Sequence, residues 1–477
     1  MNPLKKLFGQ TAIYGLGTVV PRLLNYLLLT PFYTRIFLKG EYGSVTELYA
    51  YVAFLLVLLT YGMETAFFRF AESEKNTKKV FSTSMFSLFF STVLFVSFAA
   101  IFKQQIADAI QYSANKEYIL YLAIIIGLDA FTSIPFAKLR HENKALKFAL
   151  IKIANISVNI GLNFYFYLVL AKTQHIGIEY VFISNLIATG VTLILLLPDI
   201  LKISFAFDFR LLKNMLWYAL PLLIVGLAGM VNEVSDKIFL KYLTPADMNP
   251  MEQVGIYGAN YKLAVLMTIF VQMFRYAAEP FFFSQAKEKD SKKTYADVMK
   301  FFIITGLIIF LGVVLYIDVV KYFIGPAFHE GLKIVPVVLL ANLFLGIFYN
   351  QSIWYKLNNL TRYGAYIALF GAVLTIILNV VLIPIYGYTG SAWATFFCYF
   401  SMMTISYFWG NKVFYVPYNI KVIFFYFAIS LIIFIISKYI NYPSIFLQYF
   451  INTLMFLGFL TVVLYIERLF IFKTKKL

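Results

Sequence analysis

Five basic residues lie inside long apolar stretches of the chain, where a charge needs a specific reason to be present. They are Arg22, Lys152, Lys237, Lys262 and Arg275. If these stretches cross a lipid bilayer, each charge costs at least about 2.5–3.5 kcal/mol and faces a wet cavity, an acid or the membrane surface. Lys262 and Lys152 lie near the predicted ends of their stretches, where a long side chain can extend to the surface. Arg22 follows Pro21 near mid-depth, which makes it a candidate ligand-binding residue.

Acidic residues inside the apolar stretches are candidates for gating or ion coupling. Glu233, Asp236 and Lys237 share one helical face. Glu233 and Lys237 are four residues apart and are expected to neutralise each other. Asp236 is then left to carry a coupled proton or cation, or to close an outer gate. Asp129 is a weaker coupling candidate, because hydroxyl groups three and four residues later can satisfy it structurally.

Two further carboxylates, Glu64 and Glu279, lie near the predicted cytoplasmic ends of two apolar stretches. Each has a basic residue nearby in the sequence, Arg69 and Lys287 respectively. We expect either a solvated gate or an interfacial ion pair. Arg275 lies one helical turn before Glu279, so an ion pair within that helix is the structural alternative to a ligand-binding role for the arginine.

The composition explains why charges are so few. Of 477 residues, 61% are apolar and 13% are charged, whereas a soluble chain has about 45–50% apolar and about 25% charged residues. The chain is therefore predicted to be an all-α polytopic membrane protein. Its net charge of +17 fits basic cytoplasmic loops facing anionic lipids, so no nucleic-acid partner is expected. A single cysteine, Cys398, excludes a disulfide framework, and no metal or other cofactor is expected.

A membrane span needs about 20 residues, and the apolar stretches predict fourteen of them. The charge-free stretch 363–411 is too long for one helix, and we divide it at the turn around Gly387 and Gly390. The predicted spans lie near 8–37, 42–68, 80–102, 118–137, 153–171, 180–198, 213–241, 256–283, 301–317, 334–355, two within 363–411, 422–437 and 439–466. Twelve spans is the alternative.

Basic residues favour one side of this arrangement. The connections placed inside hold 26 basic residues and those placed outside hold 9. This bias predicts that both termini are cytoplasmic and that the number of spans is even. The loops are too short for an extramembrane domain, and no GxxxxGK, HExxH or G-x-S-x-G motif occurs. We therefore expect a protein that is not an enzyme.

The chain contains a weak internal repeat. With a shift of 215 residues, eight identities fall between residues 42 and 71, including Glu64 on Glu279. The repeat predicts a six-helix bundle at 1–198, a cytoplasmic linker at 199–212, a second six-helix bundle at 213–416, and two added helices with a basic tail at 417–477. Parallel repeats of this kind place a substrate cavity between two bundles that alternate in access. Prolines and glycines in the first span of each half, such as Pro21 and Pro221, predict functional bends.

Three motifs resemble a known family. TPFYTRIFLKGEYG (30–43) with YGMETAFFRF (61–70), VGIYGANYKLA (254–264) and IPIYGYTGSAWAT (383–395) are similar to segments of the polysaccharide transporter family. These are the Wzx-like flippases of lipid-linked O-antigen and capsule units, in the multidrug/oligosaccharidyl-lipid/polysaccharide exporter superfamily. The resemblance covers nearly the whole chain except the last two spans.

The resemblance implies transport of a polyprenyl-pyrophosphate-linked oligosaccharide across the bacterial inner membrane. Flippases of lipid-linked cell-wall precursors in this superfamily use cavity arginines in spans 1 and 8, which Arg22 and Arg275 resemble by position. Arginine suits phosphate because its planar fork stays charged and donates two hydrogen bonds. Lys262 is a further candidate substrate ligand. Implied partners are membrane lipids and the polymerase and glycosyltransferases of the same pathway.

Two other functions remain open. A cation-coupled multidrug exporter of the same superfamily would favour an acidic cavity, and the embedded basic residues argue against it. A membrane-embedded glycan polymerase or ligase would need a large external loop, and the longest outer connection, about 103–117, is short.

Overall fold

The computed structural model describes residues 3–73, 77–203, 206–286, 288, 290–440 and 444–474, with backbone only for 3–16, 18, 73 and 469–474. Every regular element in this part of the chain is a helix. A chain in lipid must satisfy its backbone hydrogen bonds internally, and helices do so within each segment. The all-α membrane fold predicted from composition is therefore confirmed. The contacts divide the chain into two compact units, residues 1–33 with 40–241, and residues 34–39 with 242–477.

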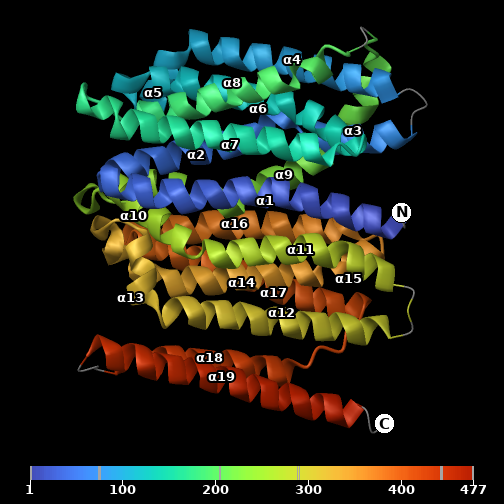
Figure 1. The fold of residues 1–477 in the computed structure, drawn as a ribbon. Coiled ribbons are helices and arrows are strands. Elements are labelled where there is room, and N and C mark those ends of the chain that lie inside the picture. Colours follow the sequence, from blue (N-terminus) through green and yellow to red (C-terminus); the bar gives the residue numbers. More distant parts are fainter. Residues whose placement is uncertain are drawn as a thin grey trace. The chain divides into compact units, whose positions relative to one another are not determined.

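The first unit consists of long helices that run roughly parallel (Figure 1). Its elements are α1 (Pro3–Ile36), α2 (Lys39–Thr60), α3 (Met63–Ser73), α4 (Thr77–Ile101), α5 (Lys103–Ala109), η1 (Ser113–Asn115), α6 (Glu117–His141), α7 (Ala145–Leu168), η2 (Leu170–Lys172), α8 (Glu179–Ile200) and α9 (Phe209–Leu243). The predicted span 42–68 is interrupted between α2 and α3, where Tyr61 and Gly62 both have positive φ angles. A tight cluster that includes Phe67, Met85 and Met215 joins α3, α4 and α9.

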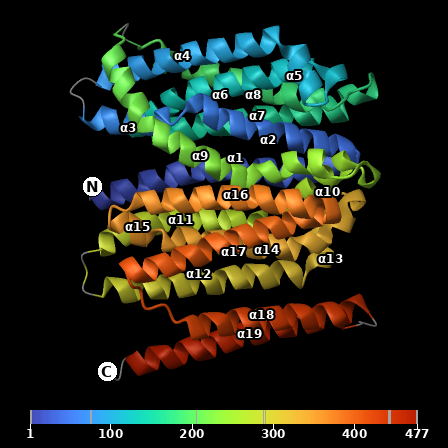
Figure 2. The same cartoon turned by 180° about the vertical axis from the view of Figure 1, so that it is seen from behind.

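The second unit contains the remaining helices, seen from behind in Figure 2. They are η3 (Ala246–Met248), α10 (Pro250–Leu263), α11 (Val265–Gln285), α12 (Ser291–Val314), α13 (Ile317–Val320), η4 (Lys321–Phe323), η5 (Pro326–Ile334), α14 (Val335–Gln351), α15 (Ile353–Leu357), α16 (Thr361–Tyr386), α17 (Tyr388–Val413), α18 (Ile420–Tyr439) and α19 (Ile445–Thr474). The predicted span 256–283 is bent by 53° between α10 and α11. The predicted break at Gly387 is confirmed: this residue has φ +54° and separates α16 from α17.

Helices α18 and α19 lie side by side at one edge of this second unit (Figures 1 and 2). Asn452 of α19 donates to the Leu315 carbonyl over 2.7 Å, and the hydroxyls of Tyr316 and Thr453 are 2.8 Å apart. Glu467 forms an ion pair with Lys300 of α12 at 2.6 Å. These contacts attach α19 to α12 and to the two residues that follow it through polar groups.

The number of membrane-spanning helices agrees with the sequence pattern. Eleven helical segments of the described chain are long and apolar enough to cross a membrane, or twelve if the bent α10–α11 pair is one span. Helices α1 and α17 contain 34 and 26 residues, long enough to cross about 30 Å of hydrocarbon. Counting both gives the fourteen that the sequence predicts.

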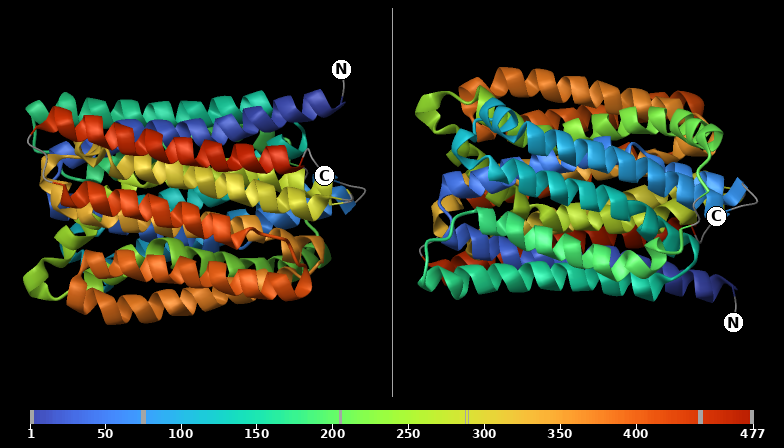
Figure 3. Two further views of the ribbon diagram at one scale, coloured as in Figure 1. Left: turned by 90° about the horizontal axis from the view of Figure 1, so that it is seen from below. Right: turned by 90° about the horizontal axis from the view of Figure 1, so that it is seen from above.

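Helix α9 belongs by its contacts to the first unit, although the internal repeat makes it the first span of the second half. Figure 3 gives two further views in which the long helices can be followed. Both α1 and α9 continue as single helices through their prolines, Pro21 and Pro31 in α1 and Pro221 in α9. The domain boundaries drawn from the repeat concern sequence halves and stay a prediction.

Candidate functional site

In the first unit, a charged cluster lies around Lys152 on α7. Lys152 interacts electrostatically with Asp129 and Arg140 on α6, Arg22 on α1 and Glu64 on α3. These five side chains sum to one net positive charge. The Lys152 ammonium also lies 4.0 Å from the centre of the Phe136 ring, a favourable contact for a cation. Lys152 therefore contacts groups inside the bundle.

Two members of this cluster have different partners from those the sequence suggested. The Glu64 carboxylate forms an ion pair with Arg140, 76 residues away, whereas Arg69 stacks over Tyr218 at 4.5 Å. The Asp129 carboxylate accepts a hydrogen bond from Thr189 on α8. The hydroxyls three and four residues after Asp129, of Thr132 and Ser133, donate instead to backbone carbonyls.

The second unit contains a matching ion pair. Glu279 on α11 pairs with Lys356 on α15, 77 residues later. Arg275 does not pair with Glu279 but lies over the Tyr349 ring, 4.7 Å from its centre. Arg275, Glu279, Lys356 and Tyr349 all line one narrow pocket. The structure therefore brings together two of the predicted residues, Arg275 and Glu279.

Lys262 is exposed in the last turn of α10, directly before the bend at Ala264. It lies about 18 Å along the helix from Pro250, at 1.5 Å per residue. Its predicted place near the outer end of the span stays a prediction.

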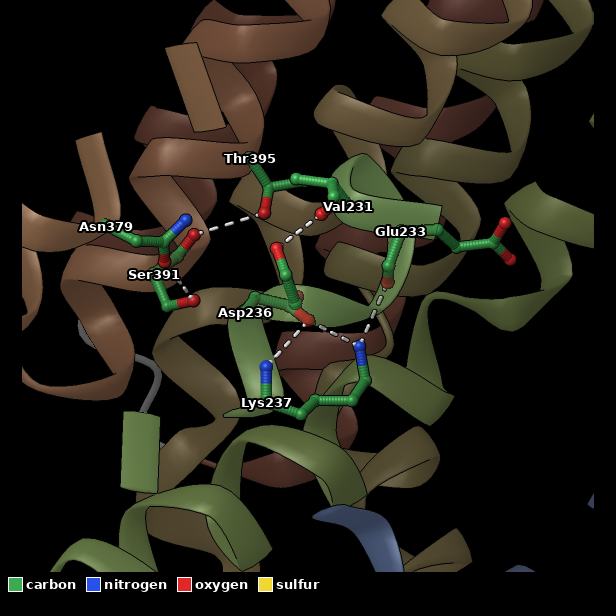
Figure 4. Close-up of polar contacts among 8 residues, drawn as sticks. Val231, Glu233, Asp236, Lys237, Asn379, Ser391 and Thr395 are labelled. Atoms are coloured by element: carbon green, nitrogen blue, oxygen red, sulfur yellow. Dashed lines mark hydrogen bonds and ion pairs between the residues drawn. The ribbon is translucent and has the colours of Figure 1, made fainter. Parts of the chain in front are cut away.

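The polar residues of α9 pair differently from the prediction (Figure 4). The Lys237 ammonium donates to the Asp236 carboxylate over 2.8 Å and to the Glu233 backbone carbonyl over 3.2 Å. The exposed Glu233 carboxylate points away from both. The predicted Glu233–Lys237 neutralisation is therefore wrong, because the neighbouring Asp236 is within reach of the lysine. If Asp236 carries a coupled proton or cation, it does so while its carboxylate is ion-paired with Lys237.

The same figure shows a buried polar contact between α16 and α17 in the second unit. Ser391 donates to the Asn379 side chain over 3.0 Å, and Thr395 donates to the Ser391 carbonyl over 3.1 Å. All three side chains are at most 4% exposed. The Ser391–Asn379 bond joins the two helices on either side of Gly387, whereas the Thr395 bond lies within α17.

Sequence reasoning missed a buried charged group in the first unit. Glu47 on α2 is fully buried, and its carboxylate lies 3.0 Å from the ammonium of Lys241 on α9. The Tyr112 hydroxyl donates to Glu47 over 2.6 Å, and Lys241 donates to the Ile110 carbonyl over 2.5 Å. Lys241 is the last residue of the predicted span 213–241, and a basic residue at the end of a span is common.

The partners Arg140 and Lys356 were also missed, although the sequence contains a signal for them. Each follows its repeat-related glutamate, Glu64 or Glu279, by 76 or 77 residues. Comparing the two halves beyond residue 71 with the shift changed from 215 to 216 places Arg140 on Lys356. Among the described residues, no group of three or more His, Cys, Asp or Glu side chains is placed to hold a metal ion.

Solved structures with the same fold are transporters. The structure titled "Lipid II flippase MurJ, inward closed conformation" matches with TM-score 0.76 and 16% identity, covering 96% of this chain and 100% of that one. An inward-facing multidrug resistance MATE family transporter of the MOP superfamily matches with TM-score 0.66 and 13% identity over 84% of this chain and 94% of that one. An outward-facing MATE family transporter matches with TM-score 0.61 and 13% identity, covering 86% of this chain and 96% of that one. At these identities the likeness establishes the fold.

The chain is thus a multi-pass helical membrane protein with the fold of these transporters. A family profile described as "Polysaccharide biosynthesis protein" matches residues 8–284. That is more than half of the chain, so the protein belongs to the polysaccharide biosynthesis protein family. No curated protein matches the chain significantly.

Proposed function

We propose that the protein is a flippase that moves a lipid-linked saccharide, a polyprenyl-pyrophosphate-linked oligosaccharide, across the bacterial cytoplasmic membrane. The observation that carries this proposal is the family match together with a fold shared over 96% of the chain with a lipid II flippase. Both termini are proposed to be cytoplasmic, as the distribution of basic residues favours. Transport is proposed to use alternating access of the two repeat-related halves.

The proposed substrate has an anionic pyrophosphate that needs cationic ligands. Arg22 and Arg275 support this role because both are exposed on long apolar helices, where an unneeded charge would be costly. Lys262 is proposed as a third ligand because it is exposed directly before the bend between α10 and α11. Glu64, Glu279, Asp129, Glu233 and the Asp236–Lys237 pair are proposed to act in gating or ion coupling.

A multidrug exporter is the second candidate, because the multidrug transporters share the fold. The coverage favours the flippase. The multidrug transporter structures cover 84–86% of this chain, whereas the lipid II flippase covers 96%. The flippase match must therefore extend into α18–α19 or other segments that the multidrug transporters lack.

The experiment is a transport assay in proteoliposomes with a fluorescent lipid-linked oligosaccharide, whose outward movement is followed by quenching from outside. Arg22→Ala and Arg275→Ala are each expected to reduce the initial rate. Arg362→Ala is the matched control, because Arg362 is an exposed arginine over a tyrosine ring in the second unit but outside the Arg275 pocket. Normal rates for both test variants at matched protein content would remove their role as phosphate ligands.

A deletion strain separates the proposed functions. The flippase proposal predicts accumulation of lipid-linked oligosaccharide in the inner leaflet. Drug efflux without any glycan phenotype would establish the exporter instead, and glycan lengthening by purified protein in vesicles would establish a polymerase.

A further inference from the structure

A groove in the first unit runs along one face of α9, and none of the residues proposed for transport lines it. Its volume is about 380 Å³, within the range of about 300–1,000 Å³ that is typical of small-molecule sites. Tyr61 lies on one side. The other side is a stripe of α9 from Phe209 to Leu223, with lining residues three or four apart and one charge among them, Lys213. Helix α9 can be followed past α3 by the labels in Figure 2.

The stripe lies on a different face of α9 from the one that packs against the unit. Met215 and Ala219 are buried in the cluster with α3 and α4. Leu216 and Trp217, which line the groove, are 39% and 68% exposed. An exposed apolar surface beside a concave space is typical of a binding site for an apolar ligand.

The break between α2 and α3 places Tyr61 in the wall of the groove. Tyr61 has φ +36°, an unusual value for a bulky residue. Its hydroxyl is hydrogen-bonded to that of Ser87 on α4, 2.6 Å away. A Cβ atom on the next residue, Gly62, would lie 3.2 Å from the Ala219 carbonyl oxygen of α9. Backbone strain of this kind is concentrated at ligand sites and switch regions, which favours a functional groove.

The groove is positively charged at the end nearer the start of α9. Lys213 lines it, and Arg210 precedes Lys213 by three residues, so both side chains lie on the same side of the helix. Both are exposed, and neither forms an ion pair within the described part of the chain. The neighbouring carboxylate of Asp208 is paired with Lys79 at 2.5 Å. This end of the groove therefore offers two basic groups to an anion.

The length of the groove matches one leaflet of a bilayer. Leu223 follows Lys213 by ten residues, which is about 15 Å along a helix. That is half of the hydrocarbon thickness of about 30 Å. Trp217, one turn after Lys213, is of a type enriched at the membrane surface. A lipid whose headgroup meets Lys213 therefore has room for one acyl chain along the groove, within its own leaflet.

We propose that this groove binds an anionic phospholipid, with the phosphate at Lys213 and Arg210 and one acyl chain between Tyr61 and the apolar stripe of α9. Basic pockets at the cytoplasmic ends of membrane helices suit anionic headgroups, and the bias of basic residues predicts that α9 begins on that side. The lipid is a resident ligand of the first unit and not the transported substrate. The site is independent of the proposed flippase function.

Trp217 provides a probe inside the groove. Purified full-length protein is reconstituted in nanodiscs of phosphatidylcholine with an increasing fraction of brominated phosphatidylglycerol, which quenches tryptophan emission on contact. Subtracting the signal of Trp217→Phe isolates Trp217 from the other three tryptophans. The reference titration uses brominated phosphatidylcholine in unlabelled phosphatidylglycerol. Half-maximal quenching of Trp217 is expected at a lower mole fraction of phosphatidylglycerol than of phosphatidylcholine.

The variants test the headgroup contact. Lys213→Gln and Arg210→Gln are each expected to raise the half-maximal fraction of phosphatidylglycerol about fivefold, the factor for losing one basic group near an anionic lipid surface. Lys213→Arg keeps the charge and should match wild type, which separates binding from a folding defect. The control Lys421→Gln removes an exposed lysine in the first turn of α18, on the same predicted side of the membrane, and should leave quenching unchanged.

Three outcomes would overturn the site. The first is equal half-maximal fractions for the two lipids in wild type. The second is an equal effect of Lys213→Gln and Lys421→Gln, because that would indicate a general attraction of the basic surface. The third is displacement of the brominated lipid by a polyprenyl phosphate more readily than by unlabelled phosphatidylglycerol, which would assign the groove to the prenyl chain of a transported lipid.

Discussion

Replacing Lys241 with methionine should destabilise the first unit strongly. Lys241 is 7% exposed and Glu47 is fully buried, so the substitution leaves a carboxylate inside the bundle without its cation. Breaking a buried ion pair by removing one partner costs about 3–5 kcal/mol. The Tyr112 hydroxyl still donates to Glu47 over 2.6 Å, which places the expected loss toward the lower end of that range.

A double-mutant cycle tests the reasoning. The double variant Glu47→Leu/Lys241→Met removes both charges and should recover most of the stability, because replacing a whole buried pair with apolar groups is often neutral or stabilising by about 1–4 kcal/mol. Removing only the Tyr112 hydroxyl, in Tyr112→Phe, should cost about 1–3 kcal/mol.

The assay is SDS-titration unfolding in detergent micelles, followed by tryptophan fluorescence, with all four members of the cycle at equal protein concentration. A loss below about 1 kcal/mol in Lys241→Met would match an exposed ion pair and contradict the burial argument. Additive effects of the two single substitutions would also contradict it, because paired groups must show a coupling energy.

Three further predictions follow from individual contacts. Glu64→Gln should lower stability by less than about 1 kcal/mol, because the Glu64–Arg140 pair is partly exposed; a loss of several kcal/mol on SDS titration would refute this. Gly387→Ala should cost about 1–3 kcal/mol, because φ +54° with ψ −136° suits only glycine; unchanged SDS unfolding would count against the turn. The Lys321 hydrogen bond lowers the pKa of Asp318, which also accepts from Gln448 of α19. The stability from this contact is present above the ordinary aspartate pKa and is lost as pH falls through the lowered one. Hydrogen exchange at the start of α19 should therefore accelerate in acid for wild type but not for Asp318→Asn, and equal profiles would contradict the linkage.

Sequence patterns predicted the helices better than the contacts between them. The break at Gly387 was predictable because a charge-free stretch twice the bilayer thickness must turn, and glycine marks the turn. The interruption at Tyr61–Gly62 was not predicted, since one glycine after an apolar run is common in membrane helices. The bend at Ala264 has no proline or glycine to mark it.

Partner choice was the least predictable property. Spacing along one helix predicted two ion pairs, Arg275–Glu279 and Glu233–Lys237. In the structure, Glu279 pairs instead with Lys356, and Lys237 pairs with Asp236. Lys356 comes from another helix, which spacing alone does not bring near.

The attachment of α18 and α19 limits how the chain can be shortened. Removing all residues after 417 would remove Glu467, which forms an ion pair with Lys300. The Lys300 side chain is only 13% exposed. The truncation would also uncover the Leu315 carbonyl to hydrocarbon, where nothing can donate to it. Lys300 would keep its ion pair with Asp297 at 3.6 Å. A viable twelve-helix derivative would therefore need, above all, a new donor for the Leu315 carbonyl. Helices α18 and α19 therefore contribute to the environment of α12. We expect a protein truncated before α18, without such a donor, to insert poorly into the membrane.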